Sequence, residues 1–362
     1  MLVYSLHFAM FFKGGNIVQI NEALVEHYKC KVIPIYELSH MVMLSTSYLK
    51  KKPTWYMVNR NLNYFKIRND YRLFTEMFFS AFGRDILGLD TLEYRLAFVR
   101  VIDPDHPNGG AHNLGLLSEI FQNKDLYNYY LVSELMDSNV LGLNGSEYSL
   151  TGLLKFFKQI LDSESYANCK DFLIKLFIAD AFTMQLDRNP NNIGFEVPKI
   201  DNVKYTSRLR GSYLRKHGFE GHYVLDKHNG PRITNFTPSK VYDNERIFGV
   251  DHKNVFSYKP GVVWTPVWPY SSDLLFKTQD EAIDAQEFFS DGMDPNLASL
   301  IIDYPECASV IDRLANDDED RGILERFKGE DSPVILSSQD LEYFEGLFSD
   351  RKKVFKKVLQ LR

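Results

Sequence analysis

Residues Ile178 to Phe195 read IADAFTMQLDRNPNNIGF and form the most informative segment of the chain. Its first part is apolar and predicts a buried helix that ends at Leu186. Pro190 cannot continue a helix, and the Asn and Asp residues around it favour a loop. The chain then resumes as a short strand. The pattern therefore predicts a rigid turn that holds Asp187 and Asn192 five positions apart between two anchored elements.

A carboxylate and an amide at this spacing suit phosphoryl transfer. In that reaction a carboxylate orients or deprotonates the attacking hydroxyl, and a nearby amide oxygen binds the magnesium ion on the nucleotide phosphates. A second carboxylate must complete the metal site, because Mg²⁺ prefers hard oxygen ligands. The segment VYDN at residues 241–244 supplies one. Asp187 is therefore the candidate catalytic base, and Asn192 and Asp243 are the candidate metal ligands.

A lysine on a strand and a glutamate on the following helix extend this pattern upstream. The segment YFKI at residues 64–67 places Lys66 in an aromatic strand, and Glu76 lies in a predicted helix over residues 71–86. An ion pair between these two side chains would fix the ammonium group against the α- and β-phosphates. The order Lys, Glu, Asp, Asn, Asp is thus present along the chain.

This ordered set resembles the HipA-like kinases, a group that includes bacterial toxin kinases and CtkA-like secreted kinases. The group is structurally akin to phosphatidylinositol kinases. The resemblance covers roughly residues 53–249. It rests on YFK at 64–66, the helical Glu76, DRxxxN at 187–192 and YDN at 242–244.

The resemblance implies an α+β, two-lobed protein-kinase-like fold with a small antiparallel-sheet N-lobe and a larger helical C-lobe. Residues 53–136 would form the N-lobe with a hinge at its end, and residues 137–362 the C-lobe with the catalytic loop, the metal-binding Asp and the C-terminal helices. Residues 1–52 match no element of the family and are expected to pack on the N-lobe. The implied activity is ATP- and Mg²⁺-dependent phosphorylation of Ser or Thr in a protein.

The family's functional residues carry over by position. Lys66 would bind phosphate and Glu76 would pair with it. Asp187 would be the catalytic base, and Asn192 and Asp243 would bind the metal. The hinge that touches the adenine would comprise Ser133, Glu134, Leu135 and Met136.

Three departures from the family pattern leave other functions open. Asn189 stands where the family often has His, and Gln185 replaces a common Asn. The expected phosphate-binding turn at residues 59–63 contains no glycine, although backbone amides approach phosphate most closely where a Cβ is absent. One alternative is therefore a pseudokinase, a binding module of the same fold. Another is a kinase that acts on a lipid or small-molecule hydroxyl.

Several of these residues also have purely structural interpretations. Lys66 could be a lysine that protects an edge strand, and Glu76 could pair with Arg72 along its helix. Asp187 could end a helix in an ion pair, and Asp243 could be a turn former. Asp180 faces an otherwise apolar helix, so we expect it to accept hydrogen bonds from the catalytic loop or from Arg188.

Periodicity predicts the remaining elements. We expect strands over residues 55–58, 62–67, 92–98 and 129–136, and helices over residues 71–86, 153–161 and 171–186. Ser149 or Thr151 would cap the second of these helices. A hairpin is expected around residues 228–230, within a basic segment over residues 198–240, and several helices between residues 278 and 362.

Composition excludes some classes of protein. The chain has 362 residues, with 42 Lys and Arg against 48 Asp and Glu, and this net charge of −6 argues against a general nucleic-acid binder. Three widely spaced cysteines support neither a disulfide framework nor a zinc site, and they favour a reducing compartment.

Location is predicted from the apolar segments. The N-terminal MLVYSLHFAMFFKGG lacks a basic start, so we interpret it as a buried strand, with a degenerate signal peptide as the alternative. Residues 172–186 are too short and too charged to cross a bilayer, so no membrane insertion is expected. A cytoplasmic location is predicted, and a secreted effector is left open.

Overall fold

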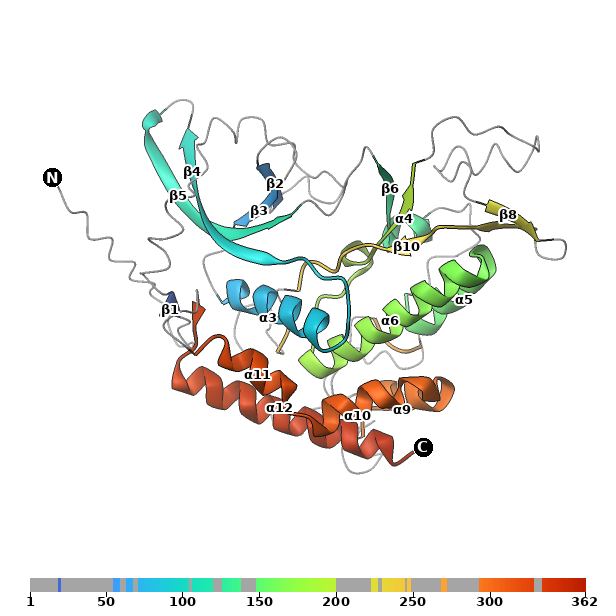
Figure 1. The fold of residues 1–362 in the computed structure, drawn as a ribbon. Helices are drawn as coiled ribbons and strands as arrows, with labels where there is room; N and C mark the ends of the chain where they lie inside the picture. The colour runs from blue at the N-terminus through green and yellow to red at the C-terminus, as the bar shows by residue number, and fades with distance from the viewer. Residues whose placement is uncertain are drawn as a thin grey trace.

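The structure is a computed structural model of the chain. It describes residues 19–20, 55–58, 63–67, 71–103, 106–119, 126–137, 148–199, 223–226, 230–244, 246–248, 268–271, 293–328 and 334–362. These residues form a mixed α/β fold with small antiparallel sheets and two groups of helices (Figure 1). The expectations for residues 1–52 apart from 19–20, for most of the turn at 59–63 and for most of the basic segment lie outside the described residues.

A four-stranded antiparallel sheet with the order β2-β3-β5-β4 comes first along the chain. Its strands are β2 (Trp55–Val58), β3 (Asn63–Ile67), β4 (Tyr94–Asp103) and β5 (His106–Glu119). Lys66 pairs with Trp55 of β2 on one side and with Leu116 of β5 on the other. Because β3 has a neighbour on both sides, the interpretation of Lys66 as an edge-strand lysine is wrong.

Helix α3 (Arg72–Asp85) runs beneath this sheet and carries a row of buried phenylalanines. Phe74, Phe78 and Phe82 are four positions apart, so they share one face of the helix, and all three are fully buried. The ring of Phe74 lies 5.0 Å from that of Phe344, and the ring of Phe78 lies 5.6 Å from that of Phe348. Burial of these rings by the C-terminal part of the chain fixes α3 in place.

A three-stranded sheet with the order β10-β7-β6 stands beside the first. Its strands are β6 (Tyr127–Leu131), β7 (Gly194–Pro198) and β10 (Thr237–Pro238), and helix α4 (Val132–Asp137) follows β6 directly. The predicted strand over 129–136 is therefore wrong beyond Leu131. The backbone N–H of Leu131 donates to Oε2 of Glu134 at 2.9 Å. A glutamate three positions after the first residue of a helix start stabilises the helix in this way.

Helices α5 (Leu150–Ile160) and α6 (Ser163–Thr183) pack against this second sheet. Ser149 caps α5 through its side chain, as predicted. Helix α6 begins eight residues earlier than the sequence predicts, because Asp162 caps it by accepting from the Ser165 N–H. It ends at Thr183, where Met184 adopts a left-handed backbone with φ of 52°.

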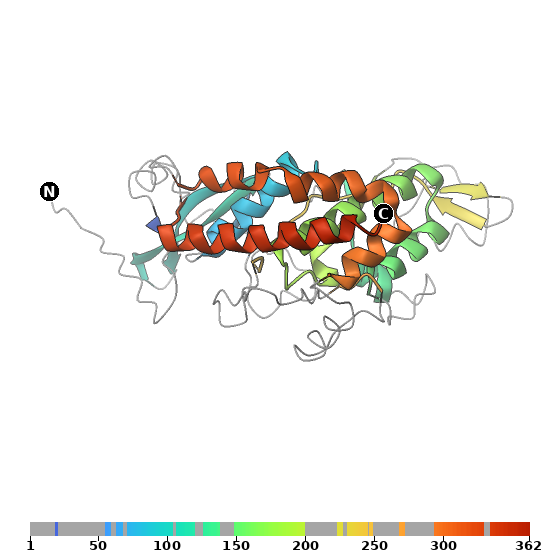
Figure 2. The ribbon, with the colours of Figure 1, turned by 90° about the horizontal axis from the view of Figure 1, so that it is seen from below.

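The C-terminal helices cover α3 and α6 on the side away from the sheets. They are α9 (Pro295–Asp303), α10 (Ala308–Asn316), α11 (Glu319–Glu325) and α12 (Ser338–Leu359). Seen from below, α12 runs alongside the row formed by α11 and α10 (Figure 2). The predicted hairpin is also present, as β8 (Tyr223–Asp226) and β9 (Gly230–Ile233). Two short strands, β1 (Gln19–Ile20) and β11 (Val334–Ile335), pair with each other.

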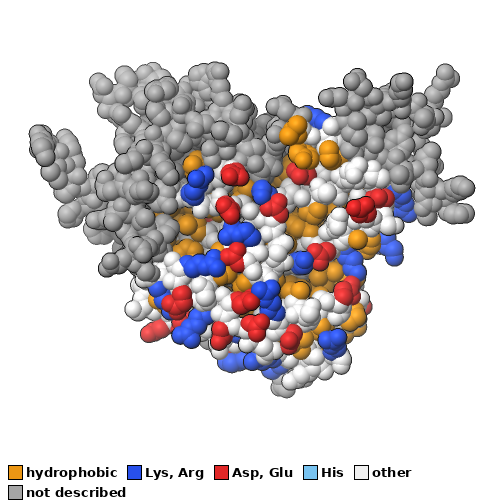
Figure 3. Space-filling view, in the orientation of Figure 1, with side chains coloured by type: hydrophobic (Ala, Val, Ile, Leu, Met, Phe, Trp, Pro, Cys, Tyr) orange, Lys and Arg blue, Asp and Glu red, His pale blue; other side chains and the backbone are white. Residues whose placement is uncertain are grey.

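The described part of one face of the molecule carries charges of both signs side by side (Figure 3). Ion pairs lie at the surface of the described residues, such as that of Lys170 with Glu306 at 2.6 Å. Such surface pairs contribute little to stability. Among the helices within the described ranges, none is long and apolar enough to span a membrane.

Candidate active site

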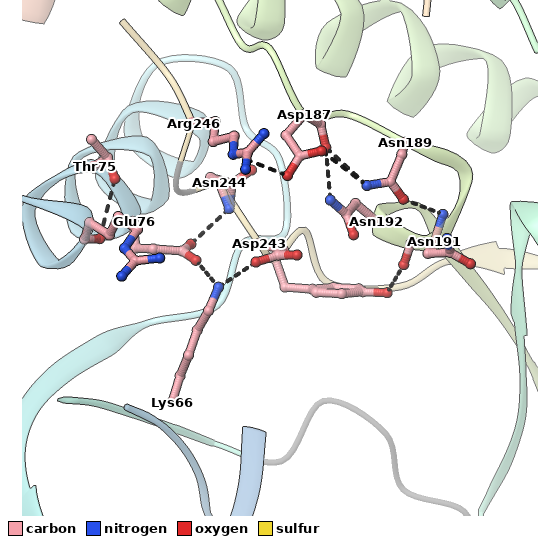
Figure 4. Close-up of polar contacts among 12 residues, drawn as sticks. Lys66, Thr75, Glu76, Asp187, Asn189, Asn191, Asn192, Asp243, Asn244 and Arg246 are labelled. Atoms are coloured by element: carbon pink, nitrogen blue, oxygen red, sulfur yellow. Dashed lines mark hydrogen bonds and ion pairs between the residues drawn. The ribbon is translucent and has the colours of Figure 1, made fainter. Parts of the chain in front are cut away.

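Lys66, Glu76 and Asp243 meet where the first sheet, α3 and the segment after β10 come together (Figure 4). The ammonium group of Lys66 donates to Oε1 of Glu76 and to Oδ1 of Asp243. The side chains of Lys66 and Glu76 are fully buried, whereas that of Asp243 is 26% exposed. Buried charges need partners, and here one ammonium group serves two carboxylates.

The second oxygen of Glu76 holds the backbone beside Asp243. The Asn244 N–H donates to Oε2 of Glu76 at 2.9 Å. Asp243 itself has a left-handed backbone with φ of 60°, a conformation that non-glycine residues adopt rarely. Glu76 is therefore bonded both to Lys66 and to the backbone of the segment that presents Asp243. The expected pairing of Lys66 with Glu76 is present, while the expected role of Lys66 toward phosphate stays a prediction.

Tyr94 of β4 lies close to this buried cluster. Burial, together with the negative charges of Glu76 and Asp243, raises the pKa of its phenol well above the ordinary value. The hydroxyl of Tyr94 consequently keeps its proton and can act as a hydrogen-bond donor beside the two carboxylates.

The turn after α6 holds Asp187 by its backbone. The Asp187 N–H donates to Oε1 of Gln185 at 3.0 Å, and the Asp187 carbonyl accepts from Nδ2 of Asn192 at 2.8 Å. A short 3₁₀ helix, η3 (Pro190–Asn192), closes the turn, and Asn189 caps it by accepting from the Asn191 N–H. Asn192 gives its amide hydrogen to this turn, so its side-chain oxygen is the atom that could bind a metal.

The carboxylate of Asp187 faces two side chains and solvent. Nδ2 of Asn189 lies 3.3 Å from Oδ1, and Nε of Arg246 lies 3.6 Å from Oδ2. The side chain of Asp187 is 32% exposed. An ionised carboxylate held from one side and open on the other can accept a proton from an incoming hydroxyl.

Arg188 joins the turn to the segment that carries Asp243. Its guanidinium is fully buried and forms a two-point ion pair with Asp180, with both N–O distances 2.9 Å. The prediction that Asp180 pairs with Arg188 is therefore confirmed. The same guanidinium donates to Oδ1 of Asn244 at 2.6 Å, and to the backbone carbonyls of Tyr242 and Asn192.

Because it bonds both segments, Arg188 brings Asn192 and Asp243, which are 51 positions apart, into one assembly. The alternative in which Asp187 and Arg188 pair with each other to end the helix is wrong, since the partner of Arg188 is Asp180 on α6. Asp243 does stand at a left-handed turn position, as the turn-former interpretation expects. It also bonds Lys66, so the turn alone does not account for it.

The predicted hinge residues lie on α4 rather than in an extended strand. Oγ of Ser133 donates to Oδ1 of Asn191 at 2.7 Å, so this position contacts the turn after α6. The carboxylate of Glu134 accepts from the backbone N–H of Leu131 at the start of α4, and the side chain of Leu135 is buried. Met136 belongs to α4, and its side chain is not among those described. Contact of these residues with an adenine stays a prediction.

Sequence patterns missed Asn244 and Arg246, and they missed the contact of Arg188 with Asn244. Arg188 and Asn244 stand within the quoted motifs, but their side-chain contact, across 56 positions, has no local signature. Arg246 lies three positions after Asp243, and that proximity is the signal that could have identified it.

Comparison with known proteins gives structural likeness only. No protein-family model matches the chain, and no curated protein matches it. Among solved structures, the chain is similar to the Helicobacter pylori proinflammatory kinase CtkA, with 14% identity, coverage of 84% of this chain and 90% of that one, and a TM-score of 0.44.

A second similar structure is the Shewanella oneidensis MR-1 toxin–antitoxin complex of HipA and HipB with operator DNA. Its identity is 7%, its coverage is 97% of this chain and 74% of that one, and its TM-score is 0.41. The resemblance to HipA-like and CtkA-like kinases expected from the sequence is thus also found among solved structures. Identities and TM-scores this low assign no activity to the chain.

Proposed function

We propose that the chain is an ATP- and Mg²⁺-dependent phosphotransferase that phosphorylates Ser or Thr in a protein. The observation that supports this most strongly is the ammonium group of Lys66, bonded to both Glu76 and Asp243 inside the molecule. The proposed architecture is kinase-like with two lobes. The smaller lobe covers residues 53–136, and the larger covers residues 137–362. Residues 1–52 are proposed to pack on the smaller lobe, apart from β1, which pairs with β11 of the larger lobe.

The donor set of the site fits magnesium. The side-chain oxygen of Asn192 and the carboxylate of Asp243 are hard oxygen ligands, which Mg²⁺ prefers. Arg188 bonds the backbone beside each of them, at Asn192 and at Tyr242. We propose that Asn192 and Asp243 hold the ion, which when bound neutralises charge on the nucleotide phosphates.

Asp187 is the proposed base. The acceptor hydroxyl oxygen forms a bond to the γ-phosphorus while the bond between that phosphorus and the bridging oxygen of ADP breaks. The hydroxyl proton passes to the carboxylate of Asp187, which faces solvent on its open side. Lys66 orients the phosphates, Glu76 orients Lys66, and α4 with Ser133, Glu134, Leu135 and Met136 borders the adenine.

The test measures nucleotide binding and phosphoryl transfer separately. Isothermal calorimetry with Mg·ATP should show binding, and radiolabelled ATP offered with a cell lysate should label proteins. Asp187→Ala should keep binding and lose transfer. Asp171→Ala, which removes an exposed aspartate on α6, is the matched control and should behave as wild type.

The rival functions give different results in the same experiment. A pseudokinase would give no transfer with any acceptor, and a kinase for lipids or small molecules would label those acceptors instead of protein. Near-normal transfer by the Asp187→Ala protein would contradict the assignment of the base.

Compartment is proposed from the cysteines. Cys169 and Cys307 are free and buried in the structure, which agrees with a reducing environment such as the cytoplasm.

A further inference from the structure

Arg246 is held next to the turn that carries Asp187. The Leu186 N–H donates to the Arg246 carbonyl at 3.0 Å, and the Phe248 N–H donates to the Thr183 carbonyl at 2.6 Å. The two residues after Arg246, Ile247 and Phe248, are fully buried. The backbone of Arg246 is thus anchored along the end of α6, so its side chain starts from a fixed point.

The guanidinium of Arg246 extends from this point toward Asp187 (Figure 4). Its Nε lies 3.6 Å from Oδ2 of Asp187. The side chain of Arg246 is 27% exposed and that of Asp187 is 32% exposed, so the pair borders open space. A partly exposed ion pair at this distance adds little stability.

Two other cations in the described part of the site have fully buried side chains. Lys66 is fully buried between Glu76 and Asp243. Arg188 is fully buried on Asp180 and Asn244. The turn itself offers no further cation, because residues 189–192 are Asn, Pro, Asn and Asn. Among the described residues of the site, Arg246 therefore supplies a partly exposed positive charge beside the proposed base.

The reaction proposed for this site needs positive charge at that place. While the phosphoryl group moves from ATP to the acceptor hydroxyl and ADP leaves, negative charge spreads over its three equatorial oxygens. The acceptor oxygen lies next to Asp187 as its proton is removed, so the moving group passes close to the same carboxylate. A guanidinium, with five donors in a planar fork, matches phosphoryl oxygens well.

We propose that Arg246 is a catalytic residue that binds the transferred phosphoryl group in the transition state. This inference rests on the proposed phosphotransferase function. Arg246 keeps its own protons throughout, and the bonds that form and break are those between the γ-phosphorus and the acceptor and ADP oxygens. Its contribution is stabilisation of charge that exists only during transfer.

The test compares binding of Mg·ADP with binding of Mg·ADP plus aluminium fluoride, which mimics the transferring phosphoryl group. The variants are Arg246→Ala and Arg246→Lys, with Arg321→Ala as the matched control, since Arg321 is an exposed arginine that pairs with Glu325 on α11. In the wild type, aluminium fluoride should tighten binding strongly. Arg246→Ala should bind Mg·ADP with the affinity of the wild type. The increase in affinity caused by aluminium fluoride should be smaller in this variant than in the wild type by about 10²- to 10³-fold.

Further readouts separate this role from a structural one. Arg246→Lys should retain part of the gain, and added guanidinium ion should restore part of it to Arg246→Ala. A full gain in Arg246→Ala, or an equal loss of Mg·ADP binding with and without aluminium fluoride, would overturn the inference alone. Increased phosphoryl transfer by Arg246→Ala would also overturn it, because the pair with Asp187 would then be inhibitory. Absence of Mg·ADP binding by the wild type would overturn the proposed function as well.

Discussion

Lys66, Glu76 and Asp243 form a buried chain of charges in which each group depends on the next. The ammonium group lies between two carboxylates, and Glu76 also accepts from the backbone of Asn244. Taking such charges out of water costs free energy, which is recovered only while every partner is in place. The arrangement therefore acts as one unit rather than as separate pairs.

Removal of Lys66 should destabilise the protein strongly. In Lys66→Met, Glu76 is left buried with its charge unmatched, and we expect the free energy of unfolding to fall by about 3–5 kcal/mol. Urea denaturation measures this change. The double variant Lys66→Met/Glu76→Gln should lose less free energy of unfolding than the sum of the losses in the two single variants. The difference is the coupling energy, which we expect to exceed about 1 kcal/mol. Simple additivity of the two single variants would argue against a shared buried pair.

At the scale of elements, the phenylalanine face of α3 connects the Glu76 helix to the C-terminal helices. Phe348 of α12 lies 5.6 Å from Phe78 of α3 and 5.4 Å from Phe182 of α6, measured between ring centroids. The ring of Phe348 thus contacts α3, which carries Glu76, and α6, which ends just before the turn that carries Asp187. The position of Glu76 depends on packing from a helix about 270 positions away.

Phe348→Ala should therefore act on both stability and the site. Loss of a fully packed ring is expected to lower the free energy of unfolding by about 3–5 kcal/mol. Leu361→Ala, at a position 42% exposed near the same end of the chain, should change it by less than about 0.5 kcal/mol. Denaturant unfolding of the two variants makes the comparison, and equal stabilities would contradict the packing described.

Gly194 at the start of β7 offers a second test of an element. A Cβ at this position would collide with the ring of Tyr129 on β6 and lie 2.7 Å from Oγ of Ser239. Gly194→Ala should therefore reduce the melting temperature. Gly346 is the matched control, because a Cβ there meets nothing within 4 Å and the residue lies inside α12. Gly346→Ala should stabilise the protein by about 0.5–1 kcal/mol, and the opposite order would contradict the structure.

The sequence predicted helix α3 and strands β2 and β3 closely and missed strand β5, for a physical reason. Phenylalanines four positions apart make α3 evident, and its bounds differ from the prediction by one residue at each end. Strand β5 carries no such signal, because Pro107, Gly109 and Gly110 are typical of loops. It forms because strands on both sides pair with it. Tertiary pairing of this kind overrides local preference.

In the candidate site, too, some features follow from local sequence signals and others from tertiary packing. Order along the chain was enough to identify Lys66, Glu76 and Asp243 as residues that could meet, and the structure brings them into contact. The contacts of Arg188 and Arg246 depend on how separate segments pack. No local pattern predicts the contact of Arg188 with Asn244 or that of Arg246 with Asp187, since a sequence shows which residues are present and not which way a side chain turns.

At the scale of the whole molecule, nucleotide and metal should stabilise the fold together. A ligand that binds only the folded state adds about 2.7 kcal/mol when present at a hundred times its dissociation constant. We expect ATP with Mg²⁺ to raise the melting temperature by several degrees, and ATP without Mg²⁺ to raise it less. Asp243→Asn should remove the Mg²⁺-dependent part of the shift.

The control for this measurement is Asp171→Asn, which changes an exposed aspartate and should keep the full shift. Thermal denaturation followed by circular dichroism gives both values. Equal shifts with and without Mg²⁺ in the wild type would argue against Asn192 and Asp243 as metal ligands.

The dependence of α3 on α12 has a consequence for synthesis on the ribosome. Phe344 is translated about 270 positions after Phe74, and at roughly 5–20 residues per second this is a delay of tens of seconds. During that interval the apolar side of the Glu76 helix has no C-terminal helix to cover it, so chaperones have time to bind there. The nascent chain should therefore complete the buried cluster of Lys66, Glu76 and Asp243 only near the end of translation. Proteins whose N-terminal half folds independently differ in this respect.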